Sequence, residues 1–355
     1  MRYQKIKTIS IFEKSSLEIP EISIVMPVFN QELIIPLVIE NLVRSMTLTF
    51  EIIFIDDASE DASLDKILET CSRVFENRSP NFLSYSVYRN AKSKFETRCD
   101  AFGFSNSKGK FLLEVQSDMI INDHGFDKRL VQAMNQFPEL FAISGRGTEP
   151  VEVIVKDYLE YHQNFIFRAF QTFGSMMRRL KFDMNRVNGA PNKLSLPSTT
   201  VVENEEVFLE REDFDATGRA GRLGNDLFKT PRLQEIHKRL VFFGDTVMRG
   251  PLLIRADMYF LIGGLDTDTF FLGYDDHDLF CRGIVEKNWR VGYSPVLFNS
   301  PIGMGTTRKS RSFRQQLLIL REELRVHRNY KNSILYSLAV NSTSWNKLRW
   351  ISRKF

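Results

Sequence analysis

The stretch "FLLEVQSDMII", residues 111–121, is an apolar run interrupted by Gln116, Ser117 and Asp118. A short apolar run with polar residues after it is typical of a buried strand. A lone carboxylate at such a strand end needs a partner, because burying an unpaired charge costs free energy. Asp118 therefore either caps the strand locally or holds a metal and a phosphate, and this stretch alone leaves both interpretations open.

The first 150 residues repeat this pattern of apolar runs separated by helical periodicity. The runs predict strands at 22–29, 50–56, 82–88, 110–117 and 140–146, and the segments between them predict helices at 32–46, 61–77, 94–107 and 126–137. Continuous apolar runs indicate a sheet covered on both faces, so we expect a doubly wound, mostly parallel, Rossmann-like sheet. Ligands bind such sheets at the carboxyl ends of the strands, where Asn30, Asp56, Asp57 and Asp118 are found.

The composition is that of a folded protein without a disulfide framework. Of the 355 residues 43% are hydrophobic and 26% charged, and the cysteines Cys71, Cys99 and Cys281 are far apart. An odd number of distant cysteines favours a reducing compartment. With neither a signal peptide nor a run of about 20 apolar residues, we expect a cytoplasmic protein that does not cross a membrane.

The charge is concentrated at the end of the chain. From Arg308 onward there are twelve Lys and Arg residues and two Glu, although the whole chain carries only +4. Nucleic acid and an anionic membrane both suit such a tail. Because Trp345 and Trp350 lie among the basic residues, we expect peripheral contact with the inner face of a membrane and no nucleic acid. An amphipathic helix is expected at 312–329.

Two acidic clusters and one basic loop carry the chemistry. Asp56 and Asp57 suit the N–H of a uracil-type base, or else Asp57 or Ser59 caps the next helix. In "GYDDHDLFCR", residues 273–282, three acids and His277 open a helix, which is more than capping requires. "GMGTTRKSR", residues 303–311, is either a loop that closes over a diphosphate or a solvated basic loop.

Taken in order, four segments resemble family 2 glycosyltransferases. They are "SIVMPVFN" (23–30), "IDDAS" (55–59), "RCDAFGFSNSKGKFLLEVQSDM" (98–119) and "GPLLIRADMYFLIGGLDTDTFFLGYDDHDL" (250–279). The resemblance covers roughly 21–147 and 249–308. It implies an α/β GT-A fold and an inverting transferase that moves a hexosyl or N-acetylhexosaminyl group. The donor is a nucleotide sugar, with UDP favoured, and the acceptor is a glycan or lipid-linked hydroxyl, as in polysaccharide or glycoconjugate biosynthesis.

The resemblance also assigns segments and residues. It implies a nucleotide-sugar half (21–147) and a catalytic-base half (249–311). The segments that it does not cover are expected to be an N-terminal extension (1–20), an acceptor-shaping helical insertion (148–248) and basic C-terminal helices (312–355). Asp276 is the implied catalytic base, and Gly250, Asp275 and His277 lie on the acceptor side. The implied donor residues are Pro27, Phe29, Asn30, Asp57, Arg98, Gln116, Ser117, Asp118 and Arg308. Asp118 is the implied ligand of Mg²⁺ or Mn²⁺.

Two departures from the family pattern leave an alternative open. Gln116 replaces the first acid of the DxD motif, and Asn299 and Ser300 stand where a histidine often completes the metal site. A non-catalytic sugar-nucleotide-binding protein is therefore the alternative, although the acids around Asp276 favour an enzyme. No GxGxxG follows 22–29, which excludes a nicotinamide-binding Rossmann enzyme.

Overall fold

A computed structural model describes most of the chain. The described residues are 4–10, 18–77, 79–149, 151–164, 202–203, 206–209, 223–224, 238–300, 313–341 and 350–355. The basic loop 303–311 with Arg308 and Lys309, much of the segment 148–248, and Trp345 lie outside them.

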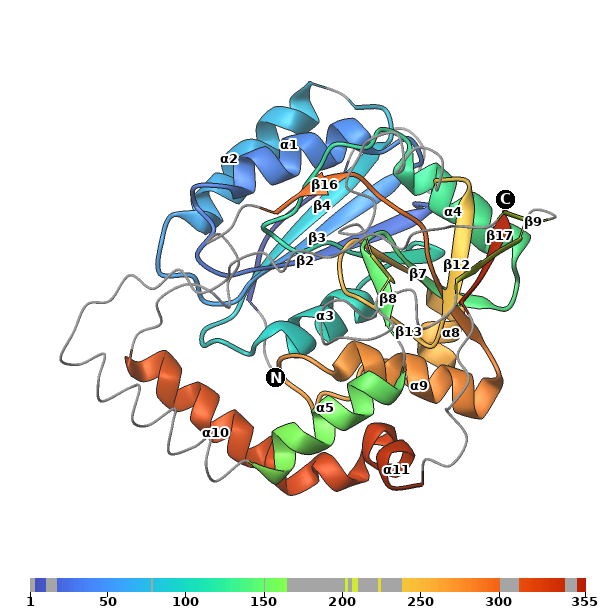
Figure 1. Cartoon of the computed structure of the whole chain (residues 1–355). Coiled ribbons are helices and arrows are strands. Elements are labelled where there is room, and N and C mark those ends of the chain that lie inside the picture. The colour runs from blue at the N-terminus through green and yellow to red at the C-terminus, as the bar shows by residue number, and fades with distance from the viewer. Residues whose placement is uncertain are drawn as a thin grey trace.

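One large sheet organises the fold, and its central strands are parallel (Figure 1). β4, β3, β2 and β5 lie side by side and run in the same direction. Beyond β5, the reversed strand β14 separates it from β7, and β7 pairs in parallel with β15. The bounds are β2 Ile22–Val28, β3 Phe50–Asp56, β4 Phe82–Arg89, β5 Phe111–Glu114, β7 Leu140–Ser144, β14 Leu252–Arg255 and β15 Arg290–Tyr293. The expected doubly wound, mostly parallel α/β sheet is confirmed.

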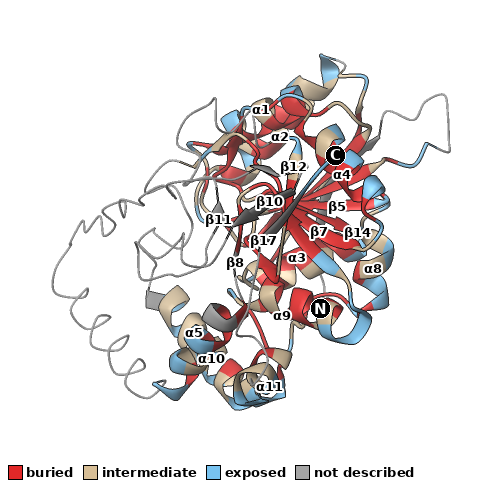
Figure 2. Cartoon of the chain, turned by 45° about the vertical axis from the view of Figure 1, so that its right-hand side comes forward, coloured by how far each residue is buried: buried red, intermediate tan, exposed pale blue. Residues whose placement is uncertain are grey.

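Both faces of this sheet are buried under helices, as the continuous apolar runs predict (Figure 2). Side chains alternate along β2, so that Ile24 and Met26 pack toward one face and Val25 toward the other. The first face is covered by α1 (Ile35–Ser45), α2 (Ser63–Glu76) and α4 (Phe126–Gln136). The second is covered by α3 (Glu96–Ser105), α8 (Ala256–Leu261) and α9 (Asp275–Lys287).

Strands far apart in the sequence extend the sheet at both edges. β1 (Gln4–Ser10) pairs antiparallel with β4 at one edge. At the other edge β15 is followed by β12 (Leu240–Gly244), β17 (Trp350–Lys354), β10 (Glu206–Leu209) and β9 (Val202–Glu203). β9, β10 and β12 come from the segment 148–248, so part of the expected helical insertion belongs to the main sheet.

Smaller elements complete the insertion and the second half of the chain. β8 (Gly147–Glu149) lies between β11 (Leu223–Gly224) and β13 (Thr246–Val247), and β6 (Ile120–Ile121) pairs with β16 (Phe298–Asn299). α5 (Val151–Gln163) packs through Val151, Val155 and Tyr158 against Phe270 and the C-terminal Leu335.

The C-terminal segment differs from the helical tail that the sequence predicts. α10 (Phe313–Asn329) confirms the expected helix, and the short helix η3 (Tyr330–Asn332) and α11 (Ile334–Asn341) follow it. α11 buries Leu335 completely, and β17 lies between β12 and β10 in the sheet. The prediction of a helical end is therefore wrong for Trp350–Lys354, because these residues find hydrogen-bonding partners in the strands on either side. No helix among the described residues is long and apolar enough to cross a membrane.

Removal of β17 should destabilise the whole domain. A chain that ends at residue 349 leaves β12 and β10 without the strand that pairs with both. Since each lost kcal/mol lowers the melting temperature of a domain of this size by about 2–4 °C, we expect a fall of about 5 °C or more in a thermal melt.

Arg353→Ala is the matched control, because the Arg353–Glu139 pair is exposed and contributes about 1 kcal/mol or less. A truncated chain that melts like the full chain would show that the sheet does not depend on β17.

Candidate functional site

A cavity of about 130 Å³ opens at the carboxyl edge of the parallel strands. It brings together six of the residues predicted to bind the donor, from the ends of β2, β3 and β5: Pro27, Phe29, Asp57, Gln116, Ser117 and Asp118. The convergence follows from the parallel topology, which places the carboxyl ends of neighbouring strands together. A second cavity, partly lined by Arg89 and Lys92, shares Phe29 and Ser93 with the first.

Asp57 is buried and fully hydrogen-bonded. Its Oδ1 accepts from Asn90 Nδ2 at 2.8 Å and the Lys94 N–H at 2.7 Å. Its Oδ2 accepts from Ser93 Oγ at 2.6 Å and the Phe95 N–H at 3.0 Å. These four bonds use the acceptor capacity of a carboxylate and fix the segment 93–95 beside the cavity. Neither Asp57 nor Ser59 caps α2, which begins at Ser63 without a side-chain capping bond.

Asn30 and Arg98 do not line either cavity. Asn30 is in the left-handed region with φ +52°. Its N–H donates to Ser59 Oγ, and its Oδ1 accepts from the Glu60 N–H. The guanidinium of Arg98 donates to Glu322 on α10 at 2.8 Å. In this structure, both residues tie the turns and helices around the cavity together.

Asp118 lies in the cavity wall with 9% of its surface exposed. Its Oδ2 accepts a hydrogen bond from the Ser300 hydroxyl at 2.9 Å. Ser300 thus reaches the acid from the position where the sequence lacks the expected histidine. Gln116 turns toward α3, where its Nε2 lies 3.4 Å from Glu96 Oε1. Among the described residues, Asp118 caps no helix or strand end.

The three acids at the start of α9 have different partners. Asp275 pairs with Arg249, and Asp278 pairs with Arg282 at 2.8 Å. Asp276 has 8% of its side chain exposed, and its Oδ2 lies 3.9 Å from Arg249 Nε. The N-cap residue of α9 forms no side-chain capping bond, so simple capping does not explain the cluster.

His277 lies beside this cluster without joining it. Its N–H donates to Asp276 Oδ1, and its Nδ1 lies 2.9 Å from the Thr246 hydroxyl. The expectation that His277 lies on the acceptor side stays a prediction.

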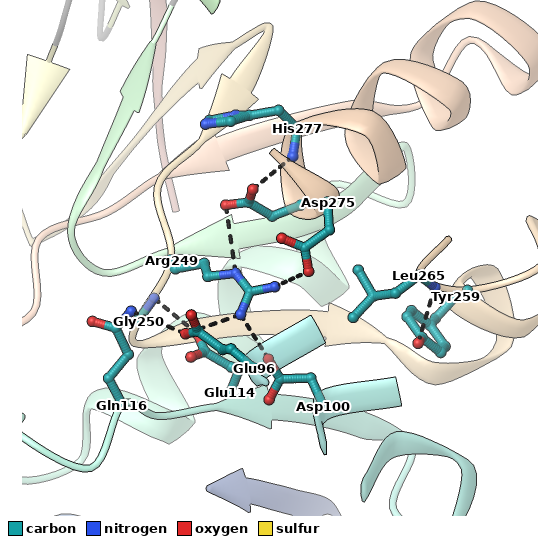
Figure 3. A network of polar contacts seen from close by, with 12 residues as sticks. Glu96, Asp100, Glu114, Gln116, Arg249, Gly250, Tyr259, Leu265, Asp275 and His277 are labelled. Carbon is teal, nitrogen blue, oxygen red and sulfur yellow. Dashed lines mark hydrogen bonds and ion pairs between the residues drawn. The ribbon is translucent and has the colours of Figure 1, made fainter. Parts of the chain in front are cut away.

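Arg249 connects the α9 acids to the cavity (Figure 3). Its guanidinium is 10% exposed and reaches Glu96 at 3.0 Å and Asp100 at 2.6 Å on α3, in addition to Asp275 and Asp276. Glu96 lines the cavity, so a single side chain contacts both the cavity wall and the predicted base.

Burial dominates the electrostatics of this network. It raises the pKa of Glu114 to about 8 and that of Asp275 to about 6, and Arg249 counteracts the rise in both. It raises the pKa of Asp100 well above its usual range. Burial disfavours the charge on Arg249, but the surrounding carboxylates hold the pKa of its guanidinium well above the usual value.

Glu96, Asp100 and Glu114 form a group of acids whose oxygen atoms lie within 4.8 Å of one another. Such a group could hold a cation. Since Arg249 already forms ion pairs with two of the three acids, a guanidinium supplies the positive charge at this place.

Gly250 occupies a position that excludes a side chain. It has φ +55°, and its N–H donates to Glu114 Oε2 at 3.0 Å. A Cβ atom would lie 2.8 Å from Met119 Sδ and 3.2 Å from Gln116 Cγ. The backbone at Gly250 therefore packs directly against the strand end that carries Gln116.

Several residues of the site were not predicted from the sequence. Glu114, Arg249 and Ser300 belong to it, and Gln315, Leu318 and Ile319 of α10 form part of the cavity wall. An acid within the apolar run "FLLEV" is a signal that could have identified Glu114. Nothing in the spacing places Arg249 or α10 beside the strand ends.

The family profile described as "Glycosyl transferase family 2" matches residues 23–181. These residues include β2, β3 and β5 with the cavity at their ends. The match covers less than half of the chain, and it shows that this region is similar to family 2 glycosyltransferases. The match ends before Arg249 and α9, so the roles expected of Gly250 and Asp276 rest on the structure and on the resemblance described above.

Solved structures of glycosyltransferases are similar to the chain. GalNAc-T7 with UDP, GalNAc and Mn²⁺ has a TM-score of 0.50 at 10% identity, over 92% of this chain and 57% of that one. The mannosyltransferase PcManGT from Pyrobaculum calidifontis, in complex with GDP-Man and Mn²⁺, has a TM-score of 0.43 at 12% identity. The match covers 78% of this chain and 55% of that one. TarS 1–349 of S. aureus has a TM-score of 0.43 at 14% identity, and the match covers 91% of this chain and 76% of that one.

The chain thus spans little more than half of the first two structures. A comparison with curated protein sequences finds no match. The likeness to GalNAc-T7 concerns the fold, which is the GT-A fold of the glycosyltransferase domain.

Gly250→Ala should be more destabilising than Gly263→Ala. Both glycines have positive φ, which costs about 1–2 kcal/mol for alanine, but a Cβ at Gly263 meets nothing within 4 Å. At Gly250 the contacts with Met119 and Gln116 add an overpacking cost of about 1–3 kcal/mol. Urea unfolding of the two variants measures the difference. Equal free energies of unfolding would mean that Met119 and Gln116 can move away from the new Cβ atom without cost.

Proposed function

We propose that the chain is an inverting glycosyltransferase that moves a hexosyl or N-acetylhexosaminyl group from a nucleotide-diphosphate sugar, with UDP favoured, to a hydroxyl of a glycan or lipid-linked acceptor. One observation carries the proposal. The strand-end cavity that contains Asp57 and Asp118 is joined through Glu96 and Arg249 to Asp276. The residues that we propose to bind the donor and the proposed catalytic base therefore belong to one connected site.

We assign binding of the nucleotide base of the donor to Asp57 and to residues 93–95, which Asp57 holds in place. Ser93 and Phe95 line the cavity beside Asp57, and the second cavity continues from Ser93 toward Lys92. Since four protein donors already bind Asp57, a direct bond from a base N–H requires one of them to be displaced.

Asp118 is the residue we assign to the diphosphate side. Its carboxylate and the Ser300 hydroxyl offer oxygen ligands, which suit Mg²⁺ or Mn²⁺. One acid gives a weak site by itself, so the diphosphate oxygens have to complete it. A cation held there would neutralise the charge of the leaving nucleoside diphosphate. Arg308, which lies outside the described residues, is proposed to share this charge.

Asp276 is proposed to accept the proton of the acceptor hydroxyl. As the proton leaves, the oxygen attacks the anomeric carbon from the face opposite the diphosphate, and the configuration is inverted. Arg249, whose Nε lies 3.9 Å from this carboxylate, links Asp276 to the cavity wall through Glu96. Contact of Trp345, Lys347 and Arg349 with a membrane remains a proposal, and these residues are outside the described part of the chain.

Asp276→Asn should abolish most of the turnover and leave UDP affinity unchanged. Loss of a general base costs a factor of about 10² to 10⁴ in rate. Asp278→Asn is the matched control, because that carboxylate pairs with Arg282 and lies away from Arg249. Transfer is measured by UDP release with a donor panel and a glycan acceptor. Turnover of the Asp276 variant within a few-fold of wild type would remove this residue from the role.

Asp118→Asn should remove the dependence of metal binding on the nucleotide. Calorimetry of the unaltered protein should detect little Mn²⁺ binding without UDP and clear binding with it, because a single carboxylate needs the diphosphate as a second ligand. In the variant, the two titrations should become alike. Full transfer activity in excess EDTA would contradict the metal role and leave Asp118 as a contact to the donor itself. UDP binding without transfer in any assay would instead favour the non-catalytic alternative.

A further inference from the structure

Glu114 is a buried acid that the proposed mechanism does not use. It is the last residue of β5, a strand between β2 and β14 in the interior of the sheet, and only 2% of it is exposed. Its Oε2 accepts the Gly250 N–H at 3.0 Å, while its Oε1 is buried and has no hydrogen-bond partner. The residue also lines the donor cavity.

An unpartnered carboxyl oxygen in the interior is costly. Leaving such an atom unsatisfied generally destabilises a protein, whereas an apolar side chain of the same size would avoid the penalty. Because Glu114 faces the cavity, a bound ligand can supply the missing partner. This requires a ligand group that donates a hydrogen bond at the floor of the cavity.

A second acid, Glu96, limits which chemical groups a ligand can place beside Glu114. Glu96 lines the same cavity, and an oxygen of its carboxylate lies within 4.8 Å of one from Glu114. Arg249 forms an ion pair with Glu96 at 3.0 Å, so its guanidinium lies next to the two acids (Figure 3). The guanidinium disfavours a cationic amino group, and the carboxylates disfavour an anionic group such as a hexuronate. Neutral hydroxyl groups fit both constraints.

The two acids lie between the other parts of the proposed site. Glu114 is two residues from Gln116 and four from Asp118 along the same strand end, and Glu96 shares Arg249 with Asp276. In a single displacement, the donor sugar has to lie between the diphosphate and the base. The floor formed by Glu96 and Glu114 is therefore placed to face the sugar ring.

We infer that Glu114, with Glu96, forms the subsite for the hydroxyl groups of a neutral donor sugar, and that Glu114 selects sugars that present a free hydroxyl there. The inference rests on the proposed function. Burial raises the pKa of Glu114 to about 8, and a sugar hydroxyl, which can both donate and accept a hydrogen bond, matches the side chain in either protonation state.

The test separates binding of the sugar from binding of the nucleotide. UDP, UDP-glucose, UDP-galactose, UDP-N-acetylglucosamine and UDP-glucuronate are titrated calorimetrically into the full chain, and the neutral UDP sugar that binds most tightly serves as the probe. Glu114→Met should lower the affinity for the probe by about 10-fold or more and leave the affinity for UDP within about two-fold of the wild-type value. Glu114→Gln, which can still accept from Gly250 and donate to a hydroxyl, should stay within a few-fold of wild type for both. UDP-glucuronate should bind more weakly than the probe.

Glu51→Gln is the matched control, since Glu51 is a buried strand acid bonded to Ser23 and lies outside the cavity lining. It should leave the ratio of the two affinities unchanged. Thermal melts confirm that each variant is folded, and if the Met variant does not fold, Glu114→Leu takes its place. Equal weakening of UDP and probe, or no weakening of either, overturns the subsite. A wild-type chain that binds no UDP and no UDP sugar overturns the proposed donor cavity, and the subsite with it.

Discussion

The guanidinium of Arg249, held among buried carboxylates, is the interaction on which the arrangement of the site depends. It contacts α3 through Glu96 and Asp100 and α9 through Asp275 and Asp276, while its own backbone leads into β14. Removing one partner from such a cluster costs more than the cluster contributes to stability, because the remaining charges stay buried. The geometry between the strand-end cavity and Asp276 is thus set by charge balance as well as by packing.

β14 makes this arrangement possible. It runs against the direction of its neighbours β5 and β7, so its N-terminal end lies at the carboxyl edge of the parallel strands. Arg249 and Gly250 precede β14 directly and so arrive beside Glu114 and Gln116. A parallel strand in the same place would deliver its first residues to the opposite edge of the sheet, far from the donor cavity.

The local pattern of the sequence predicts much of this fold and less of the site. Periodicity locates α1 through α4 to within a few residues, and the polar residues after β2, β3 and β5 predict the edge that carries the cavity. The position of β17 between β12 and β10 could not be predicted, because pairing between residues more than a hundred positions apart leaves no local signal. The same limit applies to Arg249 and to the part of the cavity wall that α10 contributes. By contrast, the four groups that donate hydrogen bonds to Asp57 all lie in one short segment, residues 90–95.

The place of β17 has a consequence for the order of events during synthesis. A growing polypeptide that emerges N-terminus first can assemble β2, β3, β4 and β5 from neighbouring segments soon after they are made. The gap between β12 and β10 stays open until residues 350–354 follow, and α10 adds its side of the cavity only shortly before. Nascent chains therefore expose the unpaired edges of β12 and β10 until residues 350–354 have been made, and the cavity lacks one part of its wall until α10 has been made.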